Sequence, residues 1–258
     1  MFSFITKPIS KKIKDFFYAC GYVLILLREV LLFPGKKRIG FKVLIMQIYF
    51  TGVEALFVTA FISLGMGAVI IIQGMKLLSS FGQGDLTYKV LIMIIMRELG
   101  PIITAFIITA RSGSAITTEL GNMVISHELE AYISTGINPI SLLAVPRLIG
   151  VTTAMFFLNI YFNLFGLLGA YMVASFSQEI PFMEYSRNLV LAMTMEDIIV
   201  SLIKSIVFGM IIAIVSTYYG FSVNHAVTEV PQKTIKSIGN SITLCIIADV
   251  IIILLSSL

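Results

Sequence analysis

Residues 53–78 read VEALFVTAFISLGMGAVIIIQGMKLL, an apolar run whose charged residues, Glu54 and Lys76, lie close to its two ends. A helix needs about 20 predominantly apolar residues to cross the hydrocarbon of a bilayer, so this run is long enough to span a membrane. Four further runs share this character, at about 88–116, 142–174, 197–222 and 238–257. None of them shows the alternation of transmembrane β-strands. The sequence therefore predicts an all-α integral membrane protein with about five transmembrane helices.

The composition of the chain excludes a water-soluble fold. Of its 258 residues, 58% are hydrophobic and 12% are charged, against about 45–50% and 25% in average soluble proteins. The two histidines, His127 and His225, are far apart, and Cys20 and Cys245 lie in apolar surroundings without a metal or redox spacing. The sequence also lacks the glycine-rich phosphate loop of ATPases. We therefore expect no catalytic site, metal or cofactor in this chain, and any ATP hydrolysis must come from another chain.

Positive charge is concentrated near the N-terminus. Nine of the 18 Lys and Arg residues lie at or before Lys42, opposed there by Asp15 and Glu29. Basic residues accumulate on the cytoplasmic side of membrane helices, so this bias predicts a cytoplasmic N-terminus and not nucleic-acid binding. The apolar run at 16–33 is interrupted by Arg28 and Glu29, has basic clusters at both ends and lacks a small-residue cleavage site.

We therefore expect residues 16–33 to form an amphipathic helix that lies in the cytoplasmic interface and ends at Pro34 and Gly35. The chain then divides into a basic N-terminal segment with this interfacial helix, residues 1–48, and a five-helix transmembrane domain, residues 49–258. An odd number of spans from a cytoplasmic N-terminus places the C-terminus outside. The loops agree with this orientation, because the charges of residues 175–197 are mostly acidic and those of residues 221–239 mostly basic.

Four ionisable residues fall inside the expected spans: Arg97, Glu98, Lys204 and Asp249. A charged side chain at the bilayer centre costs about 2.5–3.5 kcal/mol on insertion scales, so it normally faces protein or a water-filled cavity. At about 1.5 Å per residue, all four lie roughly 10–17 Å below the outer surface. They are predicted to share one layer, as candidates for lining a substrate cavity. An equal alternative is that Lys204 only neutralises Glu98 or Asp249 and holds the helices together.

The segment from residue 97 to 147 is dense in short motifs. In order, they are Arg97-Glu98-Leu99-Gly100-Pro101, Arg111-Ser112-Gly113-Ser114-Ala115, Glu119-Leu120-Gly121-Asn122-Met123, Gly136-Ile137-Asn138-Pro139 and Pro146-Arg147. Pro101 predicts a kink in the second span. Residues 126–135 are too few and too polar to cross, so they predict a short cytoplasmic helix between spans two and three. Small residues at helical spacing, such as Gly166 with Ala170 and Gly209 with Ala213, predict close helix packing within one subunit.

Taken together, these motifs resemble those of the MlaE family of ABC-transporter permeases. Two positions depart from the family pattern: Ala110 stands where the family usually has Gly, and His127-Glu128 stands where it usually has Glu-Gln. The resemblance implies a homodimeric permease of the bacterial cytoplasmic (inner) membrane, with its C-terminus in the periplasm, that moves phospholipids or related lipids. It also implies a pair of cytoplasmic ATPase subunits that use ATP, an MCE-domain lipid carrier on the outer face and, in some members, a STAS-domain subunit.

The helix around residues 127–135 resembles the family's coupling helix, which docks on the ATPase. The resemblance makes six residues candidates for this coupling: His127, Glu128, Glu130, Tyr132, Gly136 and Pro139. The main alternative class is a secondary transporter or channel in which Glu98, Lys204 and Asp249 relay an ion, although the chain shows no internal repeat. A membrane-embedded lipid enzyme is disfavoured because no pair of nucleophile and base appears. Copurification of an ATPase subunit would separate the permease from both alternatives.

Overall fold

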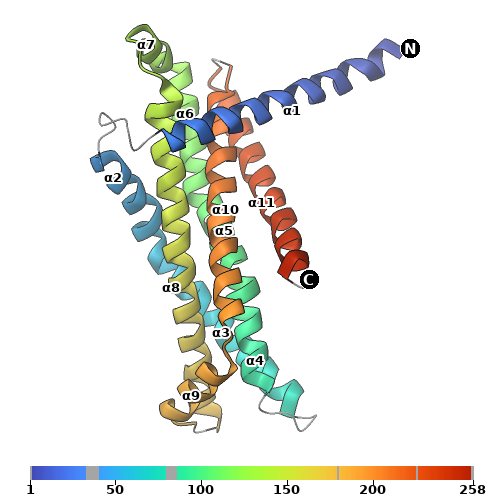
Figure 1. Ribbon diagram of the computed structural model, residues 1–258, viewed down its shortest axis with the longest axis vertical. Helices are drawn as coiled ribbons and strands as arrows, with labels where there is room; N and C mark the ends of the chain where they lie inside the picture. Colours follow the sequence, from blue (N-terminus) through green and yellow to red (C-terminus); the bar gives the residue numbers. More distant parts are fainter. Residues whose placement is uncertain (1, 33–40, 80–85, 179, 225, 257–258) are drawn as a thin grey trace.

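The computed structural model describes residues 2–32, 41–79, 86–178, 180–224 and 226–256, and their secondary structure is helical throughout. Five helical stretches are long and apolar enough to cross a membrane: Leu44–Lys76, Thr87–Ile125, Ile140–Ser177, Met195–Phe221 and Glu229–Ser256. The all-α membrane fold with five spans is therefore confirmed. Figure 1 shows these spans as a bundle of long helices with α7 at one end and α9 at the other.

The first three spans contain 3₁₀ or π-helical turns, whereas the fourth and fifth are continuous α-helices. The first span consists of α2 (Phe41–Gly52), a 3₁₀ turn (Val53–Ala55) and α3 (Leu56–Ser79). The second consists of α4 (Leu86–Ile92), the π-helical turn η3 (Met93–Leu99), α5 (Gly100–Ile108), the π-helical turn η4 (Thr109–Gly113) and α6 (Ser114–Ile125). The third begins with the π-helical turn η5 (Ile140–Ala144) and continues as α8 (Val145–Gln178). The fourth and fifth are α10 (Met195–Phe221) and α11 (Glu229–Ser256).

Three span boundaries differ from those expected. The first span begins before residue 53, because α2 starts at Phe41, so residue 48 lies inside a helix. The second continues to Ile125 and the fifth begins at Glu229, nine residues before the expected 238. The turns added to the second and fifth spans are rich in polar residues, which hydropathy assigns to loops, whereas α2 is mostly apolar. They are helical here because they pack on neighbouring helices inside the bundle.

Helix α8 lies at the centre and packs against α2, α3, α5 and α10. Two apolar cores flank it. The core in the α7 half of the bundle is built around α6, α8 and α10, with Leu120, Met155 and Phe208 as large members. The core in the α9 half includes Ile95 and Phe162. Helices α3 and α11 stay on the outside: 28% and 17% of their most apolar windows are buried, against 44–56% for the other spans.

Close approach of α3 and α8 depends on glycine. A Cβ atom on Gly67 would collide with the backbone of Gly166, and one on Gly169 with the backbone of Leu64. Gly209 of α10 fits in the same way against α8, where a Cβ would lie 2.8 Å from Thr152 Cα. The predicted packing notches at Gly166 and Gly209 are thus used inside one chain, as small residues in membrane helices commonly are.

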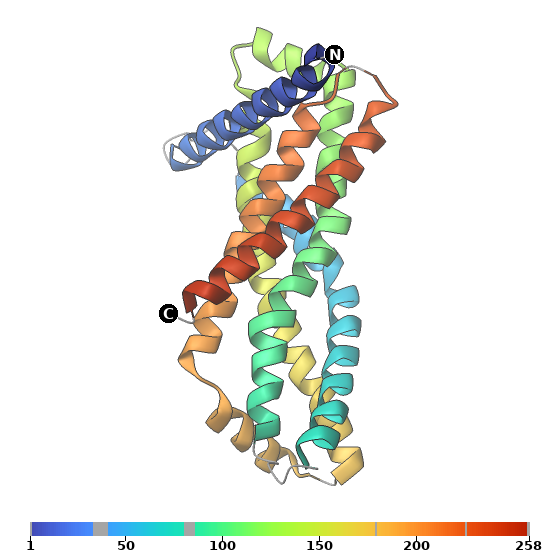
Figure 2. The same ribbon diagram turned by 90° about the vertical axis from the view of Figure 1, so that its right-hand side faces the viewer.

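Three further helices lie outside the bundle of spans. Helix α1 (Phe2–Leu31) runs across the bundle near its α7 end, steeply inclined to the spans in both views (Figures 1 and 2). Its position in the membrane interface stays a prediction, and the expected helix end at Pro34 and Gly35 lies outside the described residues. Helix α7 (Glu128–Ser134) is the predicted short helix between spans two and three.

Helix α9 (Phe182–Ala192) occupies the loop between spans three and four, where no helix was expected. Its Tyr185 is buried, and the phenol donates a 2.9 Å hydrogen bond to the carbonyl of Leu167. Burial raises the pKa of this phenol above its usual range, so the donor keeps its proton. Only two positions of α9 are buried, which made its amphipathic pattern hard to distinguish from a polar loop.

Candidate functional site

Three charged side chains from three spans meet at Lys204. Lys204 of α10 is fully buried, and its Nζ donates a 2.7 Å hydrogen bond to Glu98 Oε2. Nζ also lies 2.9 Å from Asp249 Oδ1 of α11, an ion-pair distance without the alignment of a hydrogen bond. Asp249 is nearly buried, whereas 28% of the Glu98 side chain is exposed. The structure thus brings together three of the residues that were placed in one layer by residue count.

Lys204 also completes the backbone of the second span. Its Nζ donates a 3.0 Å hydrogen bond to the carbonyl oxygen of Arg97. In a continuous α-helix that carbonyl would accept the N–H of residue 101, but Pro101 has no N–H. At this place the span has the π-helical turn η3, and the N–H of Gly100 bonds the carbonyl of Ile95 instead. The kink expected at Pro101 stays a prediction. Since a freed carbonyl within a membrane needs another donor, Lys204 has a structural role besides its charge.

Arg97 extends this cluster to the ends of α10 and α11. Its Nη2 donates a 2.6 Å hydrogen bond to Ser256 Oγ, near the end of α11. Its Nε lies 3.6 Å from Glu98 Oε1 and its Nη1 lies 3.9 Å from Asp197 Oδ1. Asp197 belongs to the capping box that starts α10 with Thr194. The Lys204 cluster, defined as Arg97, Glu98, Asp197, Lys204 and Asp249, therefore contains two basic and three acidic groups.

A second charged site lies between the first and second spans. Arg111 of η4 donates through Nη1 to the carbonyl oxygen of Glu54 and through Nη2 to Glu54 Oε2. Glu54 lies in the 3₁₀ turn that separates α2 from α3, where the regular hydrogen-bond ladder is interrupted. Arg111 thus satisfies a carbonyl at a helix break and pairs with the carboxylate of the same residue. Sequence analysis did not identify this pair, because Glu54 appeared only as a residue at the edge of a span.

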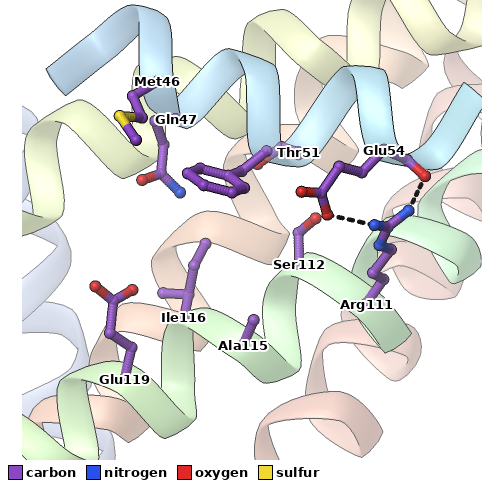
Figure 3. A pocket seen from close by; sticks show the side chains of 10 residues that line it. Met46, Gln47, Thr51, Glu54, Arg111, Ser112, Ala115, Ile116 and Glu119 are labelled. Atoms are coloured by element: carbon purple, nitrogen blue, oxygen red, sulfur yellow. Dashed lines mark hydrogen bonds and ion pairs between the residues drawn. The ribbon is translucent and has the colours of Figure 1, made fainter. Parts of the chain in front are cut away.

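The same side of the second span carries Glu119, two turns beyond Arg111. Glu119 Oε2 lies 2.8 Å from Nη2 of Arg147, whose side chain is nearly buried in α8. A cavity of about 490 Å³ lies between the Arg111–Glu54 pair and the Glu119–Arg147 pair, with α2 as one wall and α6 as the other. Figure 3 shows Gln47 and Glu54 entering it from the first span, and Ser112, Ile116 and Glu119 from the second.

Helix α7 is held to the bundle through α6 and has no buried residue. His127, at its start, has a positive φ of 59° and lies 3.1 Å from Glu130 through Nδ1 and Oε2. Ser126 Oγ donates a 3.0 Å hydrogen bond to Glu128 Oε1. These contacts fix the first turn of the helix and leave its outer surface open. The structure therefore places the candidates for ATPase coupling on an exposed helix at one end of the bundle.

Two of the candidates for ATPase coupling, Gly136 and Pro139, lie where α7 ends. Gly136 has a φ of 78°, a left-handed conformation that glycine adopts without strain. Its N–H bonds the carbonyl of Ile133 at 2.9 Å, and the N–H of Ile137 bonds the carbonyl of Tyr132 at 2.9 Å. This pair of bonds is a Schellman motif, which ends a helix and is commonly followed by proline, here Pro139. Gly136 and Pro139 therefore have a geometric role in ending α7.

Comparison with known proteins agrees with this architecture. A family model described as Permease MlaE matches residues 44–255. A probable ABC transporter permease protein of Rickettsia prowazekii is 28% identical over 217 residues, 84% of this chain and 84% of the relative. The intermembrane phospholipid transport system permease protein MlaE of Haemophilus influenzae is 25% identical over 233 residues, 89% of this chain and 88% of the relative. The chain belongs to the MlaE family of ABC-transporter permeases and crosses the membrane several times.

Proposed function

We propose that this permease moves phospholipids between the cytoplasmic (inner) membrane and an MCE-type carrier, while a separate ATPase subunit hydrolyses ATP. The name of the Haemophilus relative supports the substrate class. Membership of an ABC permease family argues against a secondary transporter with an ion relay. The protein would sit in the membrane with α1 and α7 on the cytoplasmic side and α9 on the periplasmic side.

The Lys204 cluster is the observation that carries the proposed substrate site. Charged groups from the second, fourth and fifth spans meet there. Removing charged side chains from water costs free energy, so ionisable residues inside spans are rare and usually functional. Lys204 is enclosed, whereas Arg97 and Glu98 keep 20% and 28% of their side chains exposed. At this level, the phosphate of a lipid head group would contact Arg97, and its amine would contact a carboxylate of the cluster. The proposed role of the cluster is to hold the head group while apolar faces of the spans contact the chains.

The proposed ATPase contact is α7 with the residues that follow it. Ile133 and Ile137 are 62% and 43% exposed beside charged Glu128 and Glu130, at the end of the bundle where a cytoplasmic partner would dock. A mixed apolar and charged surface of this kind suits a protein interface. The large uncovered faces of α3 and α11 support a homodimer, since a second copy would bury them. An MCE carrier would contact the α9 end, and a STAS subunit would join the ATPase side.

The proposed function is tested by reconstituting the permease with its copurified ATPase and following transfer of labelled phospholipid. A neutral cluster variant, Lys204→Met with Glu98→Gln and Asp249→Asn, should fold but transfer lipid at less than about a tenth of the normal rate, because each lost charge-assisted hydrogen bond is about tenfold in binding. Arg28→Gln, exposed on α1, serves as the control and should transfer normally. Normal transfer by the neutral variant would reduce the cluster to a structural element. No ATPase or lipid transfer in the wild-type assembly would overturn the proposed function.

A further inference from the structure

The cavity between the first and second spans, far along the bundle from the Lys204 cluster, has no part in the proposed route described above. Its charged groups are incompletely covered: 38% of the Arg111 side chain, 41% of Glu54 and 61% of Glu119 are exposed. An ion pair that only clamped two helices would be expected to be shielded from the bilayer. Here the pair faces an open space of about 490 Å³, a volume typical of small-ligand sites.

The depth of the cavity relates it to one leaflet. At about 1.5 Å per residue, Glu119 lies roughly 9 Å and Arg111 roughly 21 Å from Ile125, the α7 end of the second span. The whole span, Thr87–Ile125, is about 58 Å long at this rise, longer than a bilayer of about 40–45 Å with its head groups. With Arg97 about 15 Å below the outer surface, Arg111 falls at the head-group boundary of the α7-side leaflet and Glu119 at its surface. Met46 and Phe50 of α2 line the cavity and are 53% and 48% exposed. Its surroundings at this depth are therefore lipid.

The charges of the cavity are balanced. Two carboxylates, Glu54 and Glu119, face two guanidinium groups, Arg111 within the cavity and Arg147 behind Glu119. A guanidinium has five N–H donors, and contact with Glu54 uses two of those of Arg111. Glu54 binds Arg111 through Oε2, so its other carboxylate oxygen faces no donor among the described residues. The site thus offers donors for an anion beside acceptors for a cation, with no net charge.

We propose that this cavity binds the head group of a zwitterionic, amine-bearing phospholipid from the leaflet on the α7 side. The phosphate lies on Arg111, the ammonium lies between the carboxylates of Glu54 and Glu119, and an acyl chain leaves across Phe50 and Met46. An anionic head group without an amine would place an uncompensated negative charge beside two carboxylates, so it binds more weakly. The class of lipid deepens the proposed function, but binding here requires neither the ATPase nor transport.

The test uses the purified full chain in maltoside micelles and a phosphatidylethanolamine with a photoactivatable acyl chain. Cross-linked peptides should map to residues 44–54 and 111–119. Ala115→Phe fills the cavity and keeps every charge, and Arg111→Gln removes the phosphate donor; each should lower the cross-linking yield about tenfold. Leu168→Phe, on the exposed face of α8, adds similar bulk elsewhere and should leave the yield unchanged. Phosphatidylglycerol with the same chain should cross-link several-fold less.

The proposal would be overturned by labelling in the Ala115→Phe variant equal to wild type, or by equal labelling by phosphatidylglycerol. Cross-linking of Ala115→Cys to a second copy of the chain would also overturn it, because it would make the cavity a subunit contact. The Ala115 variant keeps the test decisive if Arg111→Gln fails to fold. Loss of lipid transfer in the reconstitution with normal labelling here would contradict the proposed function alone. Normal transfer without labelling would contradict this inference alone.

Discussion

Lys204→Met removes one positive charge from a position where it has three partners, and the structure predicts the size of the effect. The substitution keeps the length of the apolar stem but leaves Asp249, 8% exposed, without its cation, and Glu98 with Arg97 alone at 3.6 Å. Breaking a buried ion pair from one side costs about 3–5 kcal/mol. Adding Glu98→Gln and Asp249→Asn removes the stranded charges and should restore most of this loss. A deficit of about 1–3 kcal/mol should persist, because the carbonyl of Arg97 still lacks a donor.

The assay is the free energy of unfolding by SDS titration in mixed micelles, measured for the wild type, the single variant and the neutral triple variant. Lys236→Met, which removes an exposed lysine at the other end of the fifth span, is the matched control and should change stability by less than about 0.5 kcal/mol. Stability should fall in the order wild type, triple variant, single variant. A single variant as stable as the control would refute the argument, and so would a triple variant less stable than the single one.

Three further predictions follow from the fold. Gly67→Ala should cost at least about 1–3 kcal/mol by forcing apart α3 and α8, whereas Gly65→Ala on the same helix, with nothing within 4 Å of its Cβ, should be neutral in the same SDS titration. Glu130→Lys should leave ATP hydrolysis intact and uncouple it from lipid transfer in the reconstituted assembly; normal transfer would exclude α7 as the coupling helix. Labelling by an impermeant thiol reagent should reach a cysteine at Ser257 in intact cells and spare one near Lys36, and the opposite pattern would invert the topology.

The layer of charges could be predicted from the sequence because it depends only on depth. Residue counts along three spans place Glu98, Lys204 and Asp249 at one level. Residues at the same depth lie close together when their helices cross the same bilayer side by side. Which of them pair could not be predicted, since that depends on the rotation of each helix. The bond from Lys204 to the carbonyl of Arg97 depends in addition on η3, and no residue pattern signals a π-helical turn.

The second charged site escaped prediction for a related reason. Arg111 was noticed as part of a motif, but its partner Glu54 lay outside the charges assigned to the interior of a span. The pair forms because a 3₁₀ turn exposes a carbonyl at the level of Arg111. A search for every ionisable residue within about 20 Å of the membrane centre, instead of only those in the most apolar windows, would have included both. Helix α9 was missed because two buried positions are too few to establish a period.

The π-helical turn η3 sets the angular register between two parts of the second span. Each residue advances an α-helix by about 100°, so the extra residue of a π-helical turn rotates everything on one side of it relative to the other. Ile92, directly before η3, is buried in the core of the α9 half, and Glu98, near the end of η3, accepts a hydrogen bond from Lys204. Deleting one residue from 93–97 would turn one of these side chains away from its partner. A one-residue gap in an alignment at this position therefore distinguishes homologues that keep the charged contact from those that have reoriented it.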